Sequence, residues 1–257
     1  MDAAAHQAEI RDQFTRQADP FLARHKNTND DLLALMADCA LPCAQDTLLD
    51  VACGPGIVSC SFAARVRYVM GLDMVPAMIE NARRLQTERG LCNVEWKLGQ
   101  ATDLPFGDAS FDVVVTRFSF HHFLDPSGVL REMKRVCRKD GTVVVADVTP
   151  SALTQARFNE WEILRDPSHT RALTREELRS LGDQSGLRMR RCEEFRLAMN
   201  LDQLLAGSFP KPGDADRIYE LFEEEIRTGS DGLGVAARRT DAGVVITYPV
   251  SVIAWTR

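Results

Sequence analysis

The stretch LLDVACGPG, residues 48–56, has the pattern of a buried strand that runs into a tight turn. The strand ends on an acid, Asp50, and the turn contains Gly54 and Gly56, two positions apart. Glycine allows left-handed backbone angles and lets another molecule approach the main chain closely. A helical pattern begins directly after the turn, so its first N–H groups can bind a ligand. The stretch therefore predicts a binding site at the end of this strand.

Apolar strands and helices alternate from residue 47 to residue 148. The central strands are nearly continuous apolar runs, which is expected when helices cover both faces of a sheet. This alternation predicts a parallel sheet with right-handed crossovers. The expected strands span 47–52, 68–73, 93–99, 110–120 and 142–148, and the expected helices span 57–66, 76–90 and 126–141.

The flanking segments are mostly helical. Asn29 or Asp30 is a suitable N-cap for the second helix, and Thr174 opens a capping box later in the chain. The last residues form a hairpin with its turn at 240–243, and Pro249 indicates an edge or a bulge there. The other expected elements are helices at 6–21, 29–40, 152–165, 174–186 and within 201–229, and a strand at 187–199.

Composition narrows the class of protein. The 257 residues are 45% hydrophobic and 26% charged, which is ordinary for a globular domain, and the net charge of −6 argues against a polyanionic partner. We expect no nucleic-acid partner, because no basic stripe with interleaved aromatics occurs. We also expect no membrane partner and no signal peptide, since no long apolar run is present. Seven scattered cysteines without a CxxC pair indicate a reduced, cytoplasmic protein.

The glycine turn departs from two common nucleotide-binding patterns. A dinucleotide site would have a third glycine where Ser59 stands, and a phosphate-binding loop would need a Gly-Lys-Ser/Thr run that is absent. Asp73 ends the next strand, where a carboxylate can hold both hydroxyls of a ribose and opposes a 2′-phosphate. A nucleoside with little or no phosphate therefore fits this turn best.

Four ordered segments carry a family resemblance: LLDVACGPG, GLDMVPAMIENAR, GQATDLPFGDASFDVVVTRFSFHHFLDP and LREMKRVCRKDGTVVVADV. Together they resemble the class I S-adenosylmethionine-dependent methyltransferases, in the ubiquinone/menaquinone C-methyltransferase-like branch (methyltransferase type 11). The resemblance covers roughly residues 45–150. It implies S-adenosyl-L-methionine as cofactor and S-adenosyl-L-homocysteine as product.

The resemblance also implies a set of binding residues. Asp73 would hold the ribose hydroxyls, Met74 would pack on the adenine, and Gln100 would accept a hydrogen bond from the adenine amino group. Arg117 and Phe118 would border the methionine portion. The full set implied to bind the cofactor is Asp50, Ala52, Gly54, Gly56, Asp73, Met74, Gln100, Ala101, Thr102, Arg117 and Phe118.

The expected fold class is α/β. It is a Rossmann-like, doubly wound, mostly parallel sheet with an antiparallel C-terminal strand pair, N-terminal lid helices and an inserted helical cap. The expected division is a helical lid at 1–44, a cofactor-binding core at 45–150, and the remainder of the sheet at 151–257 with a cap at about 201–229.

The candidate catalytic residues are the adjacent His121 and His122, just past the fourth strand. Methyl transfer from a sulfonium needs alignment above all, and a general base helps when the acceptor is a hydroxyl. Because neighbouring side chains diverge, only one of the two histidines can face the substrate, and we prefer His122. In the alternative interpretation the histidines have no catalytic role and brace the loop. No metal is expected, since the HHFLD segment lacks ligand spacing.

Four further residues have two readings each. His169 either reaches the pocket or, as we prefer, lies on a surface loop, and Asp147 either faces the acceptor or caps the following helix. Phe14 and Phe21 either cover the cofactor from the lid or are plain core.

The expected function is methyl transfer to a small molecule, such as a secondary metabolite, a quinone-like compound or a heterocycle, at carbon, oxygen or nitrogen. The alternatives are a cofactor-binding cyclase, pericyclase or decarboxylase, or a protein that binds the nucleoside without turnover. The oligomeric state stays open, with a homodimer among the options. The acceptor pocket is expected under the cap and to be fairly apolar, from Leu201, Leu204, Leu205, Phe209, Ile218, Leu221 and Phe222.

Overall fold

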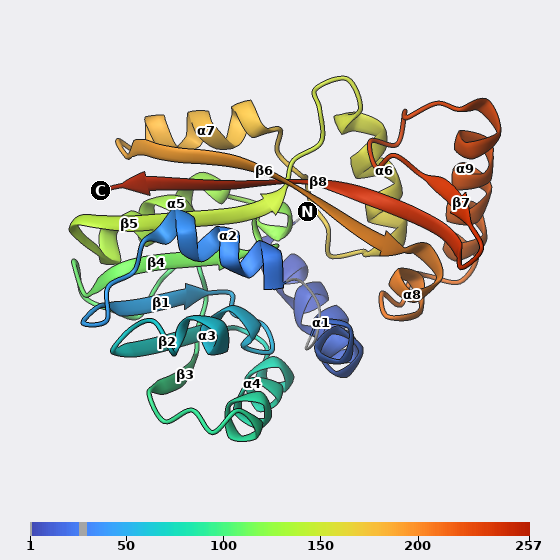
Figure 1. Cartoon of the computed structure of the whole chain (residues 1–257). Helices are drawn as coiled ribbons and strands as arrows, with labels where there is room; N and C mark the ends of the chain where they lie inside the picture. Colours follow the sequence, from blue (N-terminus) through green and yellow to red (C-terminus); the bar gives the residue numbers. More distant parts are fainter. Residues whose placement is uncertain (1, 26–29) are drawn as a thin grey trace.

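The computed structural model describes residues 2–25 and 30–257, and within them eight strands form one sheet (Figure 1). The strand order is β3-β2-β1-β4-β5-β8-β6, with β7 paired to β8. The strands are β1 Thr47–Val51, β2 Tyr68–Asp73, β3 Val94–Leu98, β4 Phe111–Arg117, β5 Cys137–Val148, β6 Arg188–Asn200, β7 Arg238–Thr240 and β8 Gly243–Thr256. The helices are α1 Ala3–His25, α2 Asp30–Ala40, α3 Ile57–Phe62, α4 Pro76–Glu88, the 3₁₀ helix η1 Phe120–His122, α5 Pro126–Val136, α6 Gln155–Arg165, α7 Arg175–Gln184, α8 Leu201–Ala206 and α9 Asp214–Thr228.

Strands β1 to β5 pair with one another in parallel, and β8 is antiparallel to both β5 and β6. Successive side chains of a strand point to opposite faces, and both faces are buried here. Leu48 and Val113 belong to the core under α2 and α3, whereas Leu49 and Val114 belong to the core under α5 and α7. The predicted doubly wound α/β fold is therefore confirmed.

The predicted helix over 126–141 is too long, because α5 ends at Val136. The next residue, Cys137, is fully buried and pairs with Phe111 of β4, so the chain already belongs to the sheet. The register of β5 against β4 then shifts, so that Val113 pairs with Thr142. The intervening residues place Asp140 at φ 62°, and Gly141 has no room for a side chain, since a Cβ would lie 2.6 Å from the Asp112 carbonyl oxygen. Helical charge spacing in this segment is thus overridden by strand pairing.

Pro249 does not lie on an edge strand, contrary to one of the two expectations. It belongs to β8, which pairs with β5 on one side and β6 on the other. The β5 ladder ends where Val148 faces Val250, and beyond it the Thr149 N–H donates to the Pro249 carbonyl at 2.8 Å. The missing proline N–H therefore removes one bond at the very end of the ladder, where its loss is tolerated.

The structure tests the predicted capping box, the hairpin turn and the N-cap of the second helix. The capping box is confirmed, because the Thr174 hydroxyl accepts from the Glu177 N–H at 3.1 Å and the Glu177 carboxylate accepts from the Thr174 N–H at 2.8 Å. The hairpin turn between β7 and β8 is also confirmed. Of the two proposed N-caps of α2, Asn29 lies outside the described residues, and Asp30 is the first residue of the helix.

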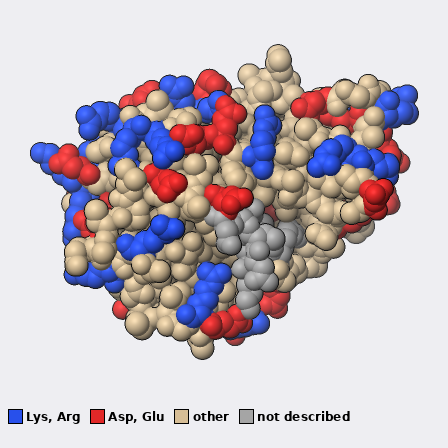
Figure 2. Space-filling model, in the orientation of Figure 1, with Lys and Arg blue, Asp and Glu red and all other residues tan. Residues whose placement is uncertain are grey.

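Helices gather beyond the carboxyl ends of the parallel strands, where α1, α6 and α8 face the sheet edge (Figure 1). The other N-terminal helix, α2, packs instead on β5 and β8. On the face seen in Figure 2, acidic and basic side chains are interspersed. Within residues 2–25 and 30–257, no helix is long and apolar enough to cross a membrane.

Candidate functional site

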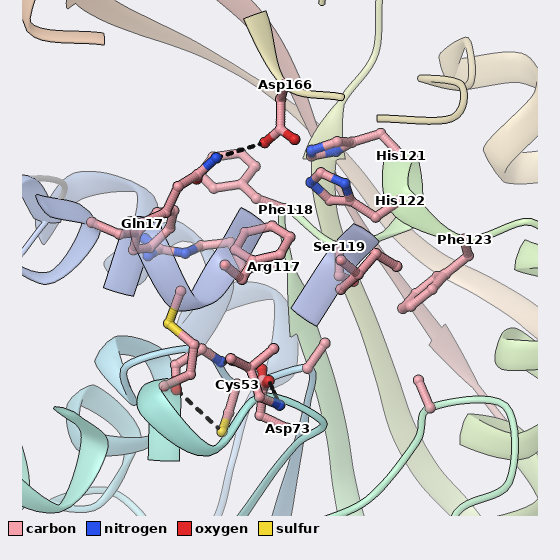
Figure 3. A pocket seen from close by; sticks show the side chains of 18 of the residues that line it. Gln17, Cys53, Asp73, Arg117, Phe118, Ser119, His121, His122, Phe123 and Asp166 are labelled. Carbon is pink, nitrogen blue, oxygen red and sulfur yellow. Dashed lines mark hydrogen bonds between the residues drawn. The ribbon is translucent and has the colours of Figure 1, made fainter. Parts of the chain in front are cut away.

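A cavity opens at the carboxyl edge of β1, β2 and β4, with α1, α6, β6 and α8 as its other walls (Figure 3). It is the place where open parallel sheets bind ligands. Of the predicted cofactor and catalytic residues, the cavity is lined by Asp50, Ala52, Gly54, Asp73, Met74, Ala101, Arg117, Phe118, His121 and His122.

The two glycines of the opening turn serve different purposes. Gly54 lines the cavity at φ 53°, and a Cβ built on it meets only the Met78 sulfur at 4.0 Å, so the main chain there is open to a ligand. Gly56, at φ 79°, caps α3, and a Cβ there would lie 2.5 Å from the ring of Trp96 and 2.9 Å from Ala82. Gly56 is therefore required for packing and does not line the cavity.

The two strand-ending acids hold the turn in shape. One carboxylate oxygen of Asp50 accepts from the Ser59 N–H at 2.9 Å and from its hydroxyl at 2.6 Å. Asp73 accepts from the Gly54 N–H at 2.8 Å and from the Val75 N–H at 2.9 Å. Burial raises the pKa of Asp50 to about 7 and also raises the pKa of Asp73. Both acids border the cavity, and their hydrogen bonds tie β1 to α3 and the end of β2 to the glycine turn.

The segment after β3 contributes two lining residues, Gly99 and Ala101, of which Ala101 was predicted. The Gln100 side chain is outside the lining, and its amide oxygen accepts from Gln7 of α1 at 2.9 Å. Thr102 is exposed to solvent and also outside the lining. These two predicted residues are not brought to the cavity.

The end of β4 places a cation, Arg117, in the lining of the cavity. Arg117 is 9% exposed, its guanidinium lies 5.2 Å from the centre of the Phe118 ring, and its Nη1 has no hydrogen-bond partner. Burial lowers the pKa of Arg117 to about 10, while the negative charge of Asp50 acts in the opposite direction. The cation stays protonated at neutral pH.

His121 is held by an acid behind it. Its Nδ1 donates to Asp147 at 2.6 Å, and the other oxygen of Asp147 accepts from the N–H groups of Ser119 and Phe120. Burial lowers the pKa of His121, yet the charge and hydrogen bond of Asp147 outweigh this, and the net shift is upward. Neither reading of Asp147 was right: outside the cavity lining, it braces the preceding η1 rather than the following helix.

His122 is oriented by the segment after α6. Its Nδ1 donates to the Ser168 carbonyl at 3.0 Å, and Phe14 of α1 packs edge-on against its ring at 4.9 Å between ring centres. This tautomer leaves a lone pair on Nε2. Burial, followed by the positive charge of His121, lowers the pKa of His122. A neutral imidazole that accepts a hydrogen bond is thus available to a ligand.

His169 is not a surface-loop residue, contrary to the preferred reading. It is 3% exposed and stacks on His121 at 5.4 Å. Its Nε2 donates to the side-chain oxygen of Asn159 at 2.7 Å. Burial and the two neighbouring histidines lower the pKa of His169. His169 stays neutral and packs against His121, because the N–H groups of the next two residues donate to the His121 carbonyl and hold this segment beside η1.

The sequence reasoning missed a buried polar wall at the end of α6. Glu162 accepts from Arg165 at 2.6 Å and from the Tyr248 hydroxyl at 2.6 Å, and Asp166 accepts from Gln17 of α1 at 3.0 Å. A usable signal existed. Glu162 and Arg165 share a helical face with the apolar residues 158 and 161, so they had to be buried together.

No group of three or more His, Cys, Asp or Glu side chains is placed to hold a metal ion in the described part of the chain. Phe14 and Phe21 both line the cavity and are partly buried. All seven cysteines are unpaired.

Comparison with known proteins decides the family. A family model described as "Methyltransferase domain" matches residues 49–145. The chain is also 30% identical over 212 residues to the uncharacterized methyltransferase YcgJ of Bacillus subtilis strain 168, covering 81% of this chain and 82% of that protein. The chain belongs to the class I S-adenosylmethionine-dependent methyltransferases.

Two further similarities agree. The crystal structure of Bacillus subtilis YcgJ superposes with a TM-score of 0.81 at 24% identity, covering 89% of this chain and 99% of that one. A demethylmenaquinone methyltransferase of Clavibacter sepedonicus is 35% identical over 120 residues, 46% of this chain and 48% of that protein. As a member of this family, the methyltransferase uses S-adenosylmethionine as its cofactor.

Proposed function

We propose that this methyltransferase transfers the methyl group of S-adenosylmethionine to a small molecule held in the cavity under α1. The single observation that carries the proposal is the way α1 closes the cavity. Gln17 of α1 donates to Asp166 at 3.0 Å and to the Ser208 carbonyl at 3.2 Å, on the far wall. A polymer chain would have to break these bonds to enter, whereas a small molecule fits beneath them.

The division of the chain belongs to the same proposal. Residues 1–44 supply the lid through α1, residues 45–150 bind the cofactor, and residues 151–257 complete the acceptor side. In this division the open main chain at Gly54 and the adjacent carboxylate of Asp73 hold the ribose side of the cofactor. Met74 and Ala101 border the adenine.

When bound, S-adenosylmethionine supplies an electrophilic methyl group on a positively charged sulfur. The chain's own residues then have to position the acceptor and exclude water. The Nε2 lone pair of His122 accepts a hydrogen bond from an acceptor O–H or N–H and thereby sets its orientation. Because the pKa of His122 is lowered, it is a weak base, which suits an acceptor that is already nucleophilic, such as a phenol or an enol. His121 acts through His122 by holding η1 in place.

Apolar side chains dominate the acceptor side of the cavity. Of the seven apolar cap residues predicted to form the pocket, only Leu204 is in its lining. Other elements contribute further apolar side chains, among them Phe14 and Phe21 of α1 and Leu197 and Met199 of β6. These walls favour a fairly apolar acceptor, such as a quinone-like or heterocyclic secondary metabolite, and leave the methylated atom open between carbon, oxygen and nitrogen.

The test is transfer of a labelled methyl group. Incubating the enzyme with methyl-labelled S-adenosylmethionine and a metabolite extract is expected to label compounds that pass a small-mass filter. Label retained only on protein or nucleic acid would contradict the small-molecule assignment. Cofactor binding without any labelled product would favour the cyclase, pericyclase or decarboxylase alternative.

Two variants test the residue roles. D73A is expected to weaken S-adenosylhomocysteine binding about tenfold or more, because one charged group of the ribose site is lost. The matched control D103A removes an exposed acid outside the lining and should bind normally. H122Q is expected to lower kcat about 10²-fold or more. Unchanged turnover would make His122 a structural residue.

A further inference from the structure

Arg117 is a charged cavity residue that the proposed function leaves without a partner. It is the last residue of β4, it is 9% exposed, and it lines the cavity. Its Nη1 is buried and makes no hydrogen bond to any described residue. A buried charge without a counter-charge is unfavourable, so its presence in a binding cavity indicates that a bound ligand supplies the counter-charge.

The other charged groups of the cavity are already paired. Arg165 binds Glu162 at 2.6 Å and the Ser208 hydroxyl at 3.0 Å, so that cation is neutralised. The carboxylate of Asp73 accepts from two N–H groups, as does the carboxylate of Asp166 from Gln17 and Ser168. The lack of a partner at Arg117 is therefore not a general property of the charged groups in this cavity.

Asp50 does not supply the missing partner. It lowers the energy of the Arg117 charge from a distance, but no ion pair within 4.0 Å joins the two among the described residues. The oxygen of Asp50 that makes hydrogen bonds is engaged by Ser59. The contact of Arg117 with the Phe118 ring, at 5.2 Å, orients the guanidinium without neutralising it.

We propose that Arg117 is the binding site for a carboxylate of a bound ligand, an inference that rests on the proposed function of the cavity. A guanidinium is a planar fork of N–H donors that matches the two oxygens of a carboxylate. In Figure 3 Arg117 lies between Asp73, on the side of the glycine turn, and His122 and Asp166, on the acceptor side. Two sources can therefore supply the carboxylate: the methionine tail of the cofactor, or the acceptor itself.

Calorimetry with matched ligand pairs separates these sources. S-adenosylhomocysteine carries the amino-acid tail, and 5′-methylthioadenosine has the same nucleoside and sulfur without it. Benzoate and benzamide differ only in the charged group and are titrated into protein saturated with S-adenosylhomocysteine. Each ligand is measured on wild type, R117Q and R117K. The control is R131Q, which removes an exposed arginine on α5.

The expected result is a selective loss in R117Q of roughly 30-fold or more, as for removal of one partner of a buried charge pair. A loss for S-adenosylhomocysteine but not for 5′-methylthioadenosine assigns the carboxylate to the cofactor. A lost preference for benzoate over benzamide, with cofactor binding intact, assigns it to the acceptor. R117K keeps the charge without the fork and should show a smaller loss.

Two results would overturn the inference, and they differ. If wild type binds the nucleosides and R117Q binds each of the four ligands as tightly as wild type does, Arg117 is not a carboxylate site and the proposed function is unaffected. If wild type binds neither nucleoside, the proposed function fails and takes the Arg117 site with it. Unfolding temperatures of ligand-free R117Q and R117K check that each variant is folded. R117Q should be at least as stable as wild type, since an unpaired buried cation has been removed.

Discussion

Replacing Glu162 with glutamine is the sharpest test of the buried polar wall beside the cavity. Glu162 is 2% exposed and pairs with Arg165 three residues later on α6. Two N–H groups of Arg165 bind one oxygen of Glu162, at 2.9 and 2.6 Å, and the Tyr248 hydroxyl binds the other at 2.6 Å. E162Q keeps the shape and removes the charge that neutralises Arg165.

The expected loss follows from these contacts. Removing one partner of a buried ion pair costs about 3–5 kcal/mol, because the other charge is left buried and unpaired. The glutamine oxygen can still accept from Tyr248, and Asp166 remains 3.9 Å from Arg165, so the lower end applies. We expect a loss of about 3 kcal/mol in the free energy of unfolding, or a fall of about 6–12 °C in Tm for a chain of this size.

The assay is urea unfolding of wild type and E162Q, with the change read from the midpoint at constant slope. The control is E224Q on α9, where Glu224 and Arg227 have the same spacing but are exposed to solvent. E224Q should leave the midpoint unchanged within error. E162Q/R165M removes both charges of the pair and leaves Asp166 its hydrogen bonds from Gln17 and Ser168, so part of the loss should be recovered. A loss below about 1 kcal/mol for E162Q would refute the reasoning, because it would equal that of a surface pair.

Two other substitutions have definite outcomes. G56A should lower the free energy of unfolding, measured in urea, by about 2–4 kcal/mol, because the new Cβ meets Trp96 at 2.5 Å and the backbone is left-handed. The control G213A has the same backbone strain but open space around the new Cβ, so it should lose less. Equal losses in the two variants would contradict the packing argument. D147N removes the charge that raises the pKa of His121. Because the pKa of His121 is higher in the folded than in the unfolded protein, its protonation stabilises the fold at low pH. The free energy of unfolding of wild type should therefore exceed that of D147N by the full amount below about pH 6.5, and this difference should shrink as the pH rises through the raised pKa. A difference that does not depend on pH between 5 and 9 would show that His121 is not charged.

The cavity shows where sequence reasoning succeeds and where it stops. The turn at Gly54 and the acid at Asp73 could be located because each follows a strand whose apolar pattern is local. The lining by Arg117 follows from its place at the end of β4. The helical spacing of α6 indicates that Glu162 and Arg165 are buried together, but their position beside the cavity could not be located, because it depends on how α6 packs against the late strands.

Buried polar residues are the main class that sequence alone misassigned. Asp147 braces η1, and His169 stacks on His121, through contacts between residues 26 or more positions apart. Pro249 has an interior strand position that is tolerated only because β5 ends beside it. Each outcome depends on which segment arrives next to the residue, and no pattern within one segment encodes that.

The sequence by itself determined the alternation of strands and helices, the parallel sheet and the cofactor turn. These depend on hydrophobic periodicity and on glycine and acid positions within a few residues of one another. Tertiary structure alone decided which buried charges border the cavity and whether each has a counter-charge there. Arg165 is neutralised and Arg117 is not because burial and distance to a counter-charge are properties of packed elements, and those properties set the free energy of a charge.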